Sequence, residues 1–179
     1  GEYCECPNDT DHDYPFKVPQ EDLFHWTYVD QSPPIITSTT IANNNSTVSV
    51  TMNEAVFNTN SASGDLEASD FSFSLSGGVA TLSSTTPSSI SQNGNIYTLG
   101  LSLVGTPNGD ETLTVNPFTN SIYDAKGNIA STSQSNNTVK LNEMLPPTIT
   151  STTIANDNST ITVTFKSEQR RVGKEWRYR

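Results

Sequence analysis

The sequence of 179 residues predicts an all-β protein built as an antiparallel β-sandwich. Three observations predict this fold class. Short runs alternate apolar residues with Ser or Thr, dipeptides rich in Gly and Asn separate those runs, and no stretch shows the spacing of an amphipathic helix. Alternation with a period of two gives each strand one apolar face. About seven such strands in about 110 residues are typical of two packed antiparallel sheets.

The expected strands follow one another along the middle of the chain. Most of their outward positions are Ser or Thr, which suit an exposed pleat. The longest run is expected to be one continuous strand from Tyr97 to Leu103. In chain order the runs are Val48 to Met52, Phe71 to Leu75, Tyr97 to Leu103, Leu113 with Val115, and Val139 with Leu141.

Tight turns are predicted between these strands. Gly and Asn tolerate the positive φ that short hairpin connections require. The turn sequences are Gly77-Gly78, Asn93-Gly94, Asn108-Gly109 and Lys126-Gly127-Asn128.

An internal repeat sets the expected domain organisation. The chain reads PPIITSTTIANNNSTVSVTM from Pro33 and PPTITSTTIANDNSTITVTF from Pro146, and the two segments align without a gap. Agreement over this length predicts tandem domains of about one hundred residues. We expect a complete domain over residues 33–145, the truncated start of a second over 146–165, and the end of a preceding domain or a linker over 1–32.

The motifs of the complete copy resemble a known family. STVSVTMNEAVF, LEASDFSFSLSGG, NIYTLGLSLVGTPNGDETLTVNP and SIYDAKGNIAS occur in this order. Together they are similar to the bacterial immunoglobulin-like (Ig-like) repeats of large secreted or surface-anchored proteins, many of them adhesin-like. The resemblance covers residues 33–165. It implies an Ig-like β-sandwich in tandem repeats, displayed outside the cell as a structural or adhesive module and without catalytic activity.

The charge distribution excludes some classes of partner. Residues 1–165 hold three basic and 17 acidic residues, a net charge of −14. A surface this acidic repels phosphate backbones, which argues against nucleic acid as a partner. No apolar run approaches the length of a membrane span, so we expect no membrane insertion in this fragment. The expected partners are neighbouring repeats of the same chain and surface glycans or proteins.

The main functional hypothesis is a non-catalytic extracellular spacer or adhesive module. Both histidines, His12 and His25, lie outside the predicted sandwich, and no Gly-x-Ser-x-Gly motif occurs, so we expect no enzyme here. The alternative is a carbohydrate- or ligand-binding β-sandwich accessory to a secreted hydrolase. Tyr97 and Tyr123 are the only tyrosines of the complete copy that such a module could use.

A calcium site is predicted from oxygen-bearing side chains. Glu54 lies just past one strand, Asp124 opens the turn DAKGN, and Asn142 and Glu143 lie in the linker LNEMLPP. Oxygen ligands gathered at a domain junction could bind Ca²⁺ and stiffen an array of domains. The alternative is structural: Asp124 and Asn128 build the turn through side-chain to backbone hydrogen bonds, and Glu54 is solvated.

The N-terminal segment holds the only two cysteines, Cys4 and Cys6. Together with His12 they offer three zinc ligands, but their spacing matches no common structural zinc site. Pairing with cysteines upstream of this segment is the favoured alternative.

Aromatic residues also alternate in this segment, at Phe24, Trp26 and Tyr28. The pattern favours the last strand of a preceding β-domain. The alternative is a platform that stacks on sugar rings.

The last fourteen residues, KSEQRRVGKEWRYR, depart from the rest of the chain. They hold six of the nine basic residues, and the match to the first copy stops after Phe165. Residues 166–179 resemble the translation of a common sequencing adapter, RSEERRVGKECRSR, at ten of fourteen positions. We therefore expect a non-native tail. The alternative is a cationic arm that binds nucleic acid or membrane.

Overall fold

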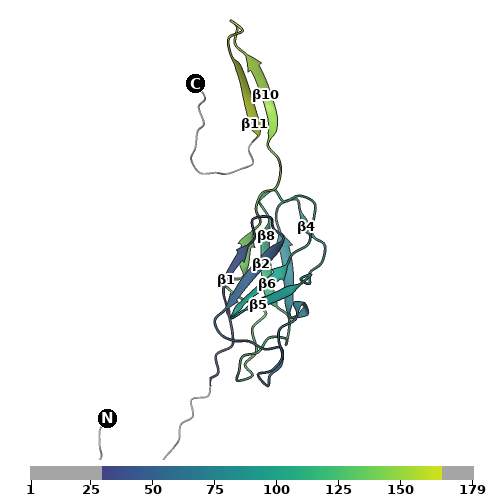
Figure 1. Cartoon of the computed structure of the whole chain (residues 1–179), viewed down its shortest axis with the longest axis vertical. Coiled ribbons are helices and arrows are strands. Elements are labelled where there is room, and N and C mark those ends of the chain that lie inside the picture. Colours follow the sequence, from purple (N-terminus) through teal and green to yellow (C-terminus); the bar gives the residue numbers. More distant parts are fainter. Residues whose placement is uncertain (1–29, 167–179) are drawn as a thin grey trace, which may run out of the picture. The chain divides into compact units, whose positions relative to one another are not determined.

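The structure, a computed structural model, describes residues 30–166. Every strand of this range lies in one compact unit, which begins at Gln31 (Figure 1). Within the described range every regular element is a strand except one short 3-10 helix, η2 (Ala68–Asp70). The prediction of an all-β fold is confirmed. No helix among residues 30–166 is long and apolar enough to cross a membrane.

The larger sheet has four antiparallel strands in the order β1-β2-β6-β5. Its second strand shows why the alternating pattern forms a half-buried strand: Val48, Val50 and Met52 are buried, and the Ser and Thr residues between them are half-buried on the other face. The bounds are β1 (Ile36–Ile41), β2 (Thr47–Met52), β5 (Ile90–Asn93) and β6 (Ile96–Gly100).

The smaller main sheet has three antiparallel strands in the order β3-β8-β9. Strands β4 and β7 form a separate pair. Along the chain, β4 lies in the connection from β3 to β5, and β7 lies in the connection from β6 to β8. The bounds are β3 (Phe71–Ser76), β4 (Thr81–Leu82), β7 (Leu103–Val104), β8 (Thr112–Pro117) and β9 (Thr138–Lys140).

One apolar core joins the two main sheets, an arrangement consistent with a β-sandwich. Both sheets contribute fully buried side chains, and the rings of Phe71 and Tyr97 meet across the core with their centroids 6.1 Å apart. The central members of the core are Val48, Val50, Tyr97 and Leu99 from the larger sheet and Phe71, Phe73, Leu113 and Val115 from the smaller one.

The predicted continuous strand from Tyr97 to Leu103 is wrong in one respect, because the run is broken after Gly100. The backbone N–H of Leu101 leaves the strand ladder and donates to the carbonyl of Ser46 at 2.9 Å. Leu103 then pairs with Leu82 of β4. The alternation continues through the break because Leu101 is still buried, so the pattern alone does not reveal that the chain changes sheets.

A further hairpin, β10 (Thr148–Ile154) and β11 (Ile161–Lys166), follows the sandwich in the chain. Its register reproduces that of β1 and β2 at the equivalent positions of the repeat. Ile149 pairs with Phe165 as Ile36 pairs with Met52. Both hairpins also contain a register shift at the same place, after the first of these pairs.

Candidate functional site

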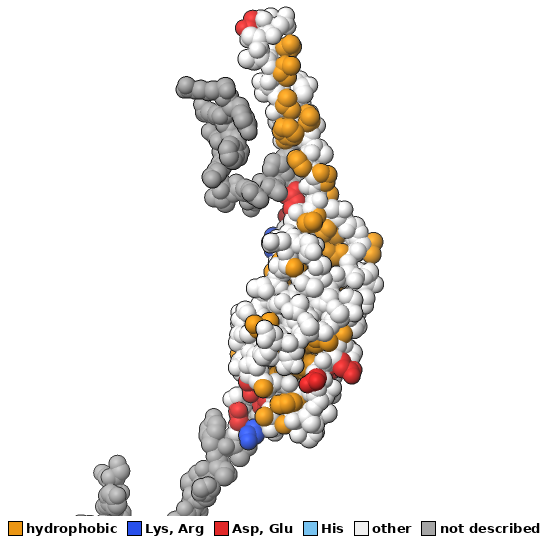
Figure 2. All heavy atoms as spheres, viewed as in Figure 1, with side chains coloured by type: hydrophobic (Ala, Val, Ile, Leu, Met, Phe, Trp, Pro, Cys, Tyr) orange, Lys and Arg blue, Asp and Glu red, His pale blue; other side chains and the backbone are white. Residues whose placement is uncertain are grey.

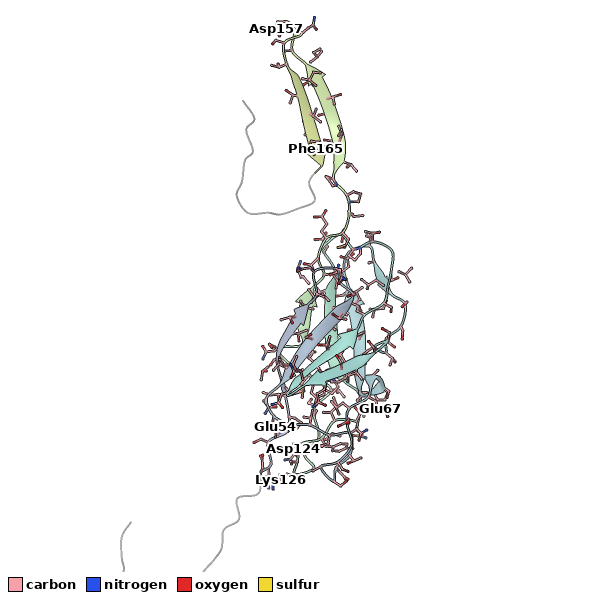
Figure 3. All side chains as sticks on the ribbon, in the orientation of Figure 1. Glu54, Glu67, Asp124, Lys126, Asp157 and Phe165 are labelled. Atoms are coloured by element: carbon pink, nitrogen blue, oxygen red, sulfur yellow. The ribbon has the colours of Figure 1, made fainter. Side chains whose placement is uncertain are left out.

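Two of the predicted calcium ligands, Glu54 and Asp124, lie together at one end of the sandwich (Figure 3). Glu54 comes shortly after the end of β2, and Asp124 begins a loop after β8. Phe57 and Tyr123 exchange two backbone hydrogen bonds of 2.8 and 2.9 Å, which hold the two segments side by side. A carboxylate oxygen of Glu54 consequently lies within 4.8 Å of one of Asp124.

Asp124 is fully buried and builds the turn in which it lies. Its Oδ1 accepts hydrogen bonds from the backbone N–H groups of Lys126 and Asn128, each at 2.8 Å, and its Oδ2 accepts one from Nδ2 of Asn128 at 2.7 Å. Burial raises the pKa of Asp124, but the hydrogen bonds outweigh burial, so that the pKa lies below its ordinary value. These are the contacts expected if Asp124 and Asn128 build the turn through hydrogen bonds, which was the alternative to a calcium site.

The pair can nevertheless offer oxygen ligands to a cation. Calcium takes six to eight oxygens, from carboxylates, carbonyl groups and water. Glu54 and Asp124 each provide one carboxylate oxygen at a separation that one ion can bridge. A calcium ion at this end of the sandwich therefore stays a prediction.

The other two predicted ligands, Asn142 and Glu143, lie near the opposite end of β2. Asn142 is hydrogen-bonded to Asn45, which precedes β2, whereas Glu54 follows that strand. Six residues of strand span about 20 Å. Glu143 packs beside the turn at Gly109, with its Cβ 3.3 Å from where a Cβ on that glycine would lie. The four residues thus form two separate groups, and one ion cannot bind all of them.

Asn45 and Asn142 form a clamp between the β1–β2 turn and the segment that follows β9. Asn45 is buried and has a left-handed backbone, with φ at 56°. Its Nδ2 donates to the carbonyl of Asn142 and its Oδ1 accepts from the N–H of Asn142, both at 2.8 Å. Nδ2 of Asn142 donates to the carbonyl of Ala42 at 3.0 Å.

A second contact extends the clamp two residues further. The N–H of Met144 donates to the carbonyl of Pro107 at 2.9 Å. The chain from Asn142 to Met144, predicted as linker, is therefore attached to the sandwich through hydrogen bonds to two different turns. These hydrogen bonds restrain the segment relative to the sandwich.

The most buried ionisable group that the sequence analysis missed is Glu111. Its side chain is fully buried and binds two turns at once. Oε1 accepts from the N–H groups of Val79 and Ala80 at 2.9 and 3.0 Å, and Oε2 accepts from that of Gly109 at 3.0 Å. The N–H of Asn108 donates to both oxygens at 3.2 Å.

The electrostatics of Glu111 follow from these donors. Burial raises its pKa, but the backbone hydrogen bonds outweigh burial and lower the pKa below its ordinary value. Gly78 is required beside it, because a Cβ there would overlap the carboxylate and the backbone φ is +60°. A signal was present in the sequence: Glu111 is in phase with Leu113 and Val115 on the inward face of β8.

The other candidate residues are buried, half-buried or outside the described range. Tyr97 is fully buried in the core, whereas Tyr123 is half-buried with its hydroxyl donating to the carbonyl of Asn120 at 3.0 Å. The candidates Cys4, Cys6, His12, Phe24, Trp26 and Tyr28, and the tail from residue 167 onward, lie outside the residues that the structure describes.

Comparison with known proteins adds no relative. No protein family, no curated protein and no solved structure matches the chain.

Proposed function

We propose that residues 33–145 form an Ig-like repeat that serves as a non-catalytic spacer or adhesive module in a longer extracellular chain. The order of strands supports this proposal. Constant-type Ig domains pair strands A-B-E-D in one sheet and C-F-G in the other. The same order results if β1, β2, β6 and β5 are read as A, B, E and D, and β3, β8 and β9 as C, F and G.

The repeated hairpin supports the tandem part of the proposal. Strands β10 and β11 have the register, bulge position and turn of β1 and β2. A chain that begins the same hairpin again directly after the sandwich is expected to begin the same domain again. The neighbouring repeat would then be the first partner of this domain.

The clamp between Asn45 and Asn142 is the observation that carries the spacer role. A spacer transmits position and force only if the exit of one domain is fixed relative to its own core. Here two side-chain amides bind the exit segment, and the hydrogen bond from Met144 to Pro107 holds it further along. These hydrogen bonds join groups of residues 33–145 only, so they can fix the path of the exit segment without any contact to the next domain.

The surface composition supports an extracellular position and a role without tight contacts. Outward positions of the strands are mostly Ser and Thr, and the net charge of residues 1–165 is −14. Net charge far from zero keeps a long array soluble. Within residues 30–166, Tyr97 is buried and cannot stack on a sugar, which weighs against the carbohydrate-binding alternative.

Backbone relaxation measured by NMR on the full chain tests the spacer role. We expect order parameters at Asn142, Glu143 and Met144 near those of β2, about 0.85 for rigid backbone. Asn45→Ala should lower them, whereas Asn44→Ala, whose side chain contacts Ser46 in the same turn, should not. Values below about 0.6 at these residues in the unmodified chain would refute a fixed exit.

A further inference from the structure

The hairpin β10–β11 carries a row of exposed hydrophobic side chains along one face (Figure 2). Between Thr148 and Lys166 the only charged residue is Asp157, in the turn. A two-stranded hairpin is marginally stable by itself in water, so an apolar face of this kind calls for a cover. The exposed fractions are 60% for Ile149, 60% for Ile154, 70% for Ile161, 41% for Val163 and 54% for Phe165.

The equivalent residues of β1–β2 show what such a face fits. Ile36, Val48, Val50 and Met52 are between 0 and 2% exposed. Three strands surround them. Strand β6 pairs with β2 from Thr47 to Thr51, and the inward side chains of β3 and β8 close the core from the opposite sheet.

The two hairpins also agree in backbone detail. Thr37 and Thr150 occupy the bulge, and their hydroxyls donate to the carbonyls of Thr51 and Thr164 at 3.0 and 3.1 Å. The turns agree too, with φ at 56° for Asn45 and 57° for Asn158. A surface that fits one backbone therefore fits the other.

We propose that β10–β11 of one chain can occupy, in a second copy of this chain, the place that β1–β2 holds against β6, β3 and β8. The inference goes beyond the spacer role and does not depend on it, because it rests on the match between the two hairpins. Exchange of an identical element between protomers is the recognised low-barrier route to such an interface.

Backbone pairing favours this occupant over simple stacking of two hairpins face to face. Complete burial of an aliphatic side chain removes roughly 60 to 120 Å² of apolar surface, from its transfer free energy and the usual coefficient. Five side chains then give at most roughly 300 to 600 Å² of apolar surface per hairpin, and simple stacking adds no backbone hydrogen bonds to it. Insertion beside β6 adds the strand ladder that β2 makes there, from Thr47 to Thr51.

The side chains explain why β1–β2 keeps its place in the intact chain. Ile149 and Val163 are identical to Ile36 and Val50. Ile161 and Phe165 are larger than Val48 and Met52, and extra volume strains a packed core. Because β1–β2 belongs to the same chain as β6, its effective concentration at that site is higher than that of β10–β11 from another chain. Exchange is therefore expected to be rare in the intact chain, where a disulfide can trap it, and to prevail when β1–β2 is weakened.

Matched aspartate substitutions in the full chain test the proposal. Val50→Asp buries an unpaired charge in β2 and disables β1–β2, and Val163→Asp disables the same position of β11. We expect V50D to keep β-type circular dichroism and cooperative unfolding while its mass by light scattering rises to two or more chains. V163D should be a folded monomer, and V50D/V163D should lose the assembly and the fold.

Three results would overturn it: V50D unfolded like the double variant, V50D folded as a monomer, or an assembly that survives in V50D/V163D. None of them bears on whether the exit segment is fixed, so failure here and failure of the spacer role are distinguishable.

Cross-linking between two otherwise native chains is a second test that needs no destabilised core. Ser49 and Thr98 have hydroxyls 2.9 Å apart across β2 and β6, and Thr162 is the equivalent of Ser49. One chain carries Thr98→Cys and the other carries Thr162→Cys, and Cys4 and Cys6 are replaced by Ser in both. Under oxidation the two chains should form a mixed disulfide dimer. Thr153→Cys is the control, because its equivalent, Thr40, pairs with Ser49 on the side away from β6. Equal dimer yield from T162C and T153C overturns the proposal.

Discussion

The hairpins β1–β2 and β10–β11 have nearly the same sequence and the same backbone, but only the first is buried. Register, bulge and turn agree pair by pair at the equivalent positions of the repeat. Ile36 is fully buried, whereas Ile149 is 60% exposed. The contacts within each hairpin therefore suffice for its shape, and the core requires strands from much later in the chain.

This difference separates two kinds of stabilisation. Turn residues and hydroxyl hydrogen bonds act within either hairpin and set its shape. Burial against β6, β3 and β8 acts on β1–β2 alone and supplies most of its free energy. Substitutions at matched positions should therefore differ widely where burial is involved and agree where only local bonds are involved.

The largest contrast is expected at the matched isoleucines. Ile36→Ala removes a fully buried side chain and should lower the free energy of unfolding by about 3 kcal/mol. Ile149→Ala at an exposed position should change it by less than about 0.5 kcal/mol. Urea unfolding of the full chain followed by fluorescence measures both. Similar losses for the two variants would show that β10–β11 is covered in solution.

The next contrast is the effect of substituting Glu111 on the sandwich and on β10–β11. The carboxylate of Glu111 binds the turns at Val79 and Gly109 and makes no hydrogen bond to either hairpin. Glu111→Gln replaces one acceptor oxygen with a donor that faces backbone N–H groups, and should lower the free energy of unfolding by about 2 kcal/mol. Amide exchange in β1–β2 should accelerate through global unfolding, while exchange in β10–β11 should not change. Asp65→Asn, at an exposed position, is the control.

The same carboxylates set the acid limit of the sandwich. The folded-state pKa values of Glu111 and Asp124 lie below their ordinary values, so their stabilisation is fully present above the unfolded pKa of about 4. It should be lost as pH falls through the lowered folded values. The free energy of unfolding of E111Q should therefore depend less on pH below about pH 4 than that of the unmodified chain. Parallel curves for the two proteins would contradict this assignment.

Sequence reasoning predicted the features that depend on neighbouring residues. The alternating runs gave strands, and Gly77, Gly78 and Gly94 have positive φ as predicted, although Asn93 is the last residue of β5 and not part of the turn. Register within each hairpin follows from the same local signals. These features are predictable because a period of two and a positive φ are properties of a few consecutive residues.

Features that depend on distant partners were not predicted. Asn45 and Asn142 are 97 residues apart, and no local pattern marks them as a pair. The break after Gly100 is hidden because Leu101 remains buried. Glu111 could have been recognised as an acidic residue in phase with an apolar face, but its donors belong to two turns that only the fold brings together.

An intermediate contrast is expected at the turn asparagines. Asn45→Gly keeps the left-handed backbone but removes the bonds to Asn142, and should lower the free energy of unfolding by about 1 kcal/mol. Asn158→Gly has the same backbone effect with no clamp, and should leave the stability of the sandwich unchanged. Thermal unfolding of both variants is the measurement. A loss in N158G as large as that in N45G would mean that the turn itself, and not the clamp, carries the stability.

The smallest effect is expected at the bulge, where the two hairpins should behave alike. Thr37→Val and Thr150→Val each remove one exposed hydroxyl bond to a carbonyl across the hairpin while keeping a β-branched side chain. Each should weaken its own hairpin by about 0.5 kcal/mol, since the carbonyl freed by the change can bind water instead. Amide exchange at Thr51 and Thr164 reports the two sites separately. We expect β1–β2 to open only with the sandwich and β10–β11 to open alone, so the absolute amide-exchange rates of the two hairpins should differ widely. The changes in free energy caused by the two substitutions should nevertheless be equal. Unequal changes would mean that burial also affects the bulge.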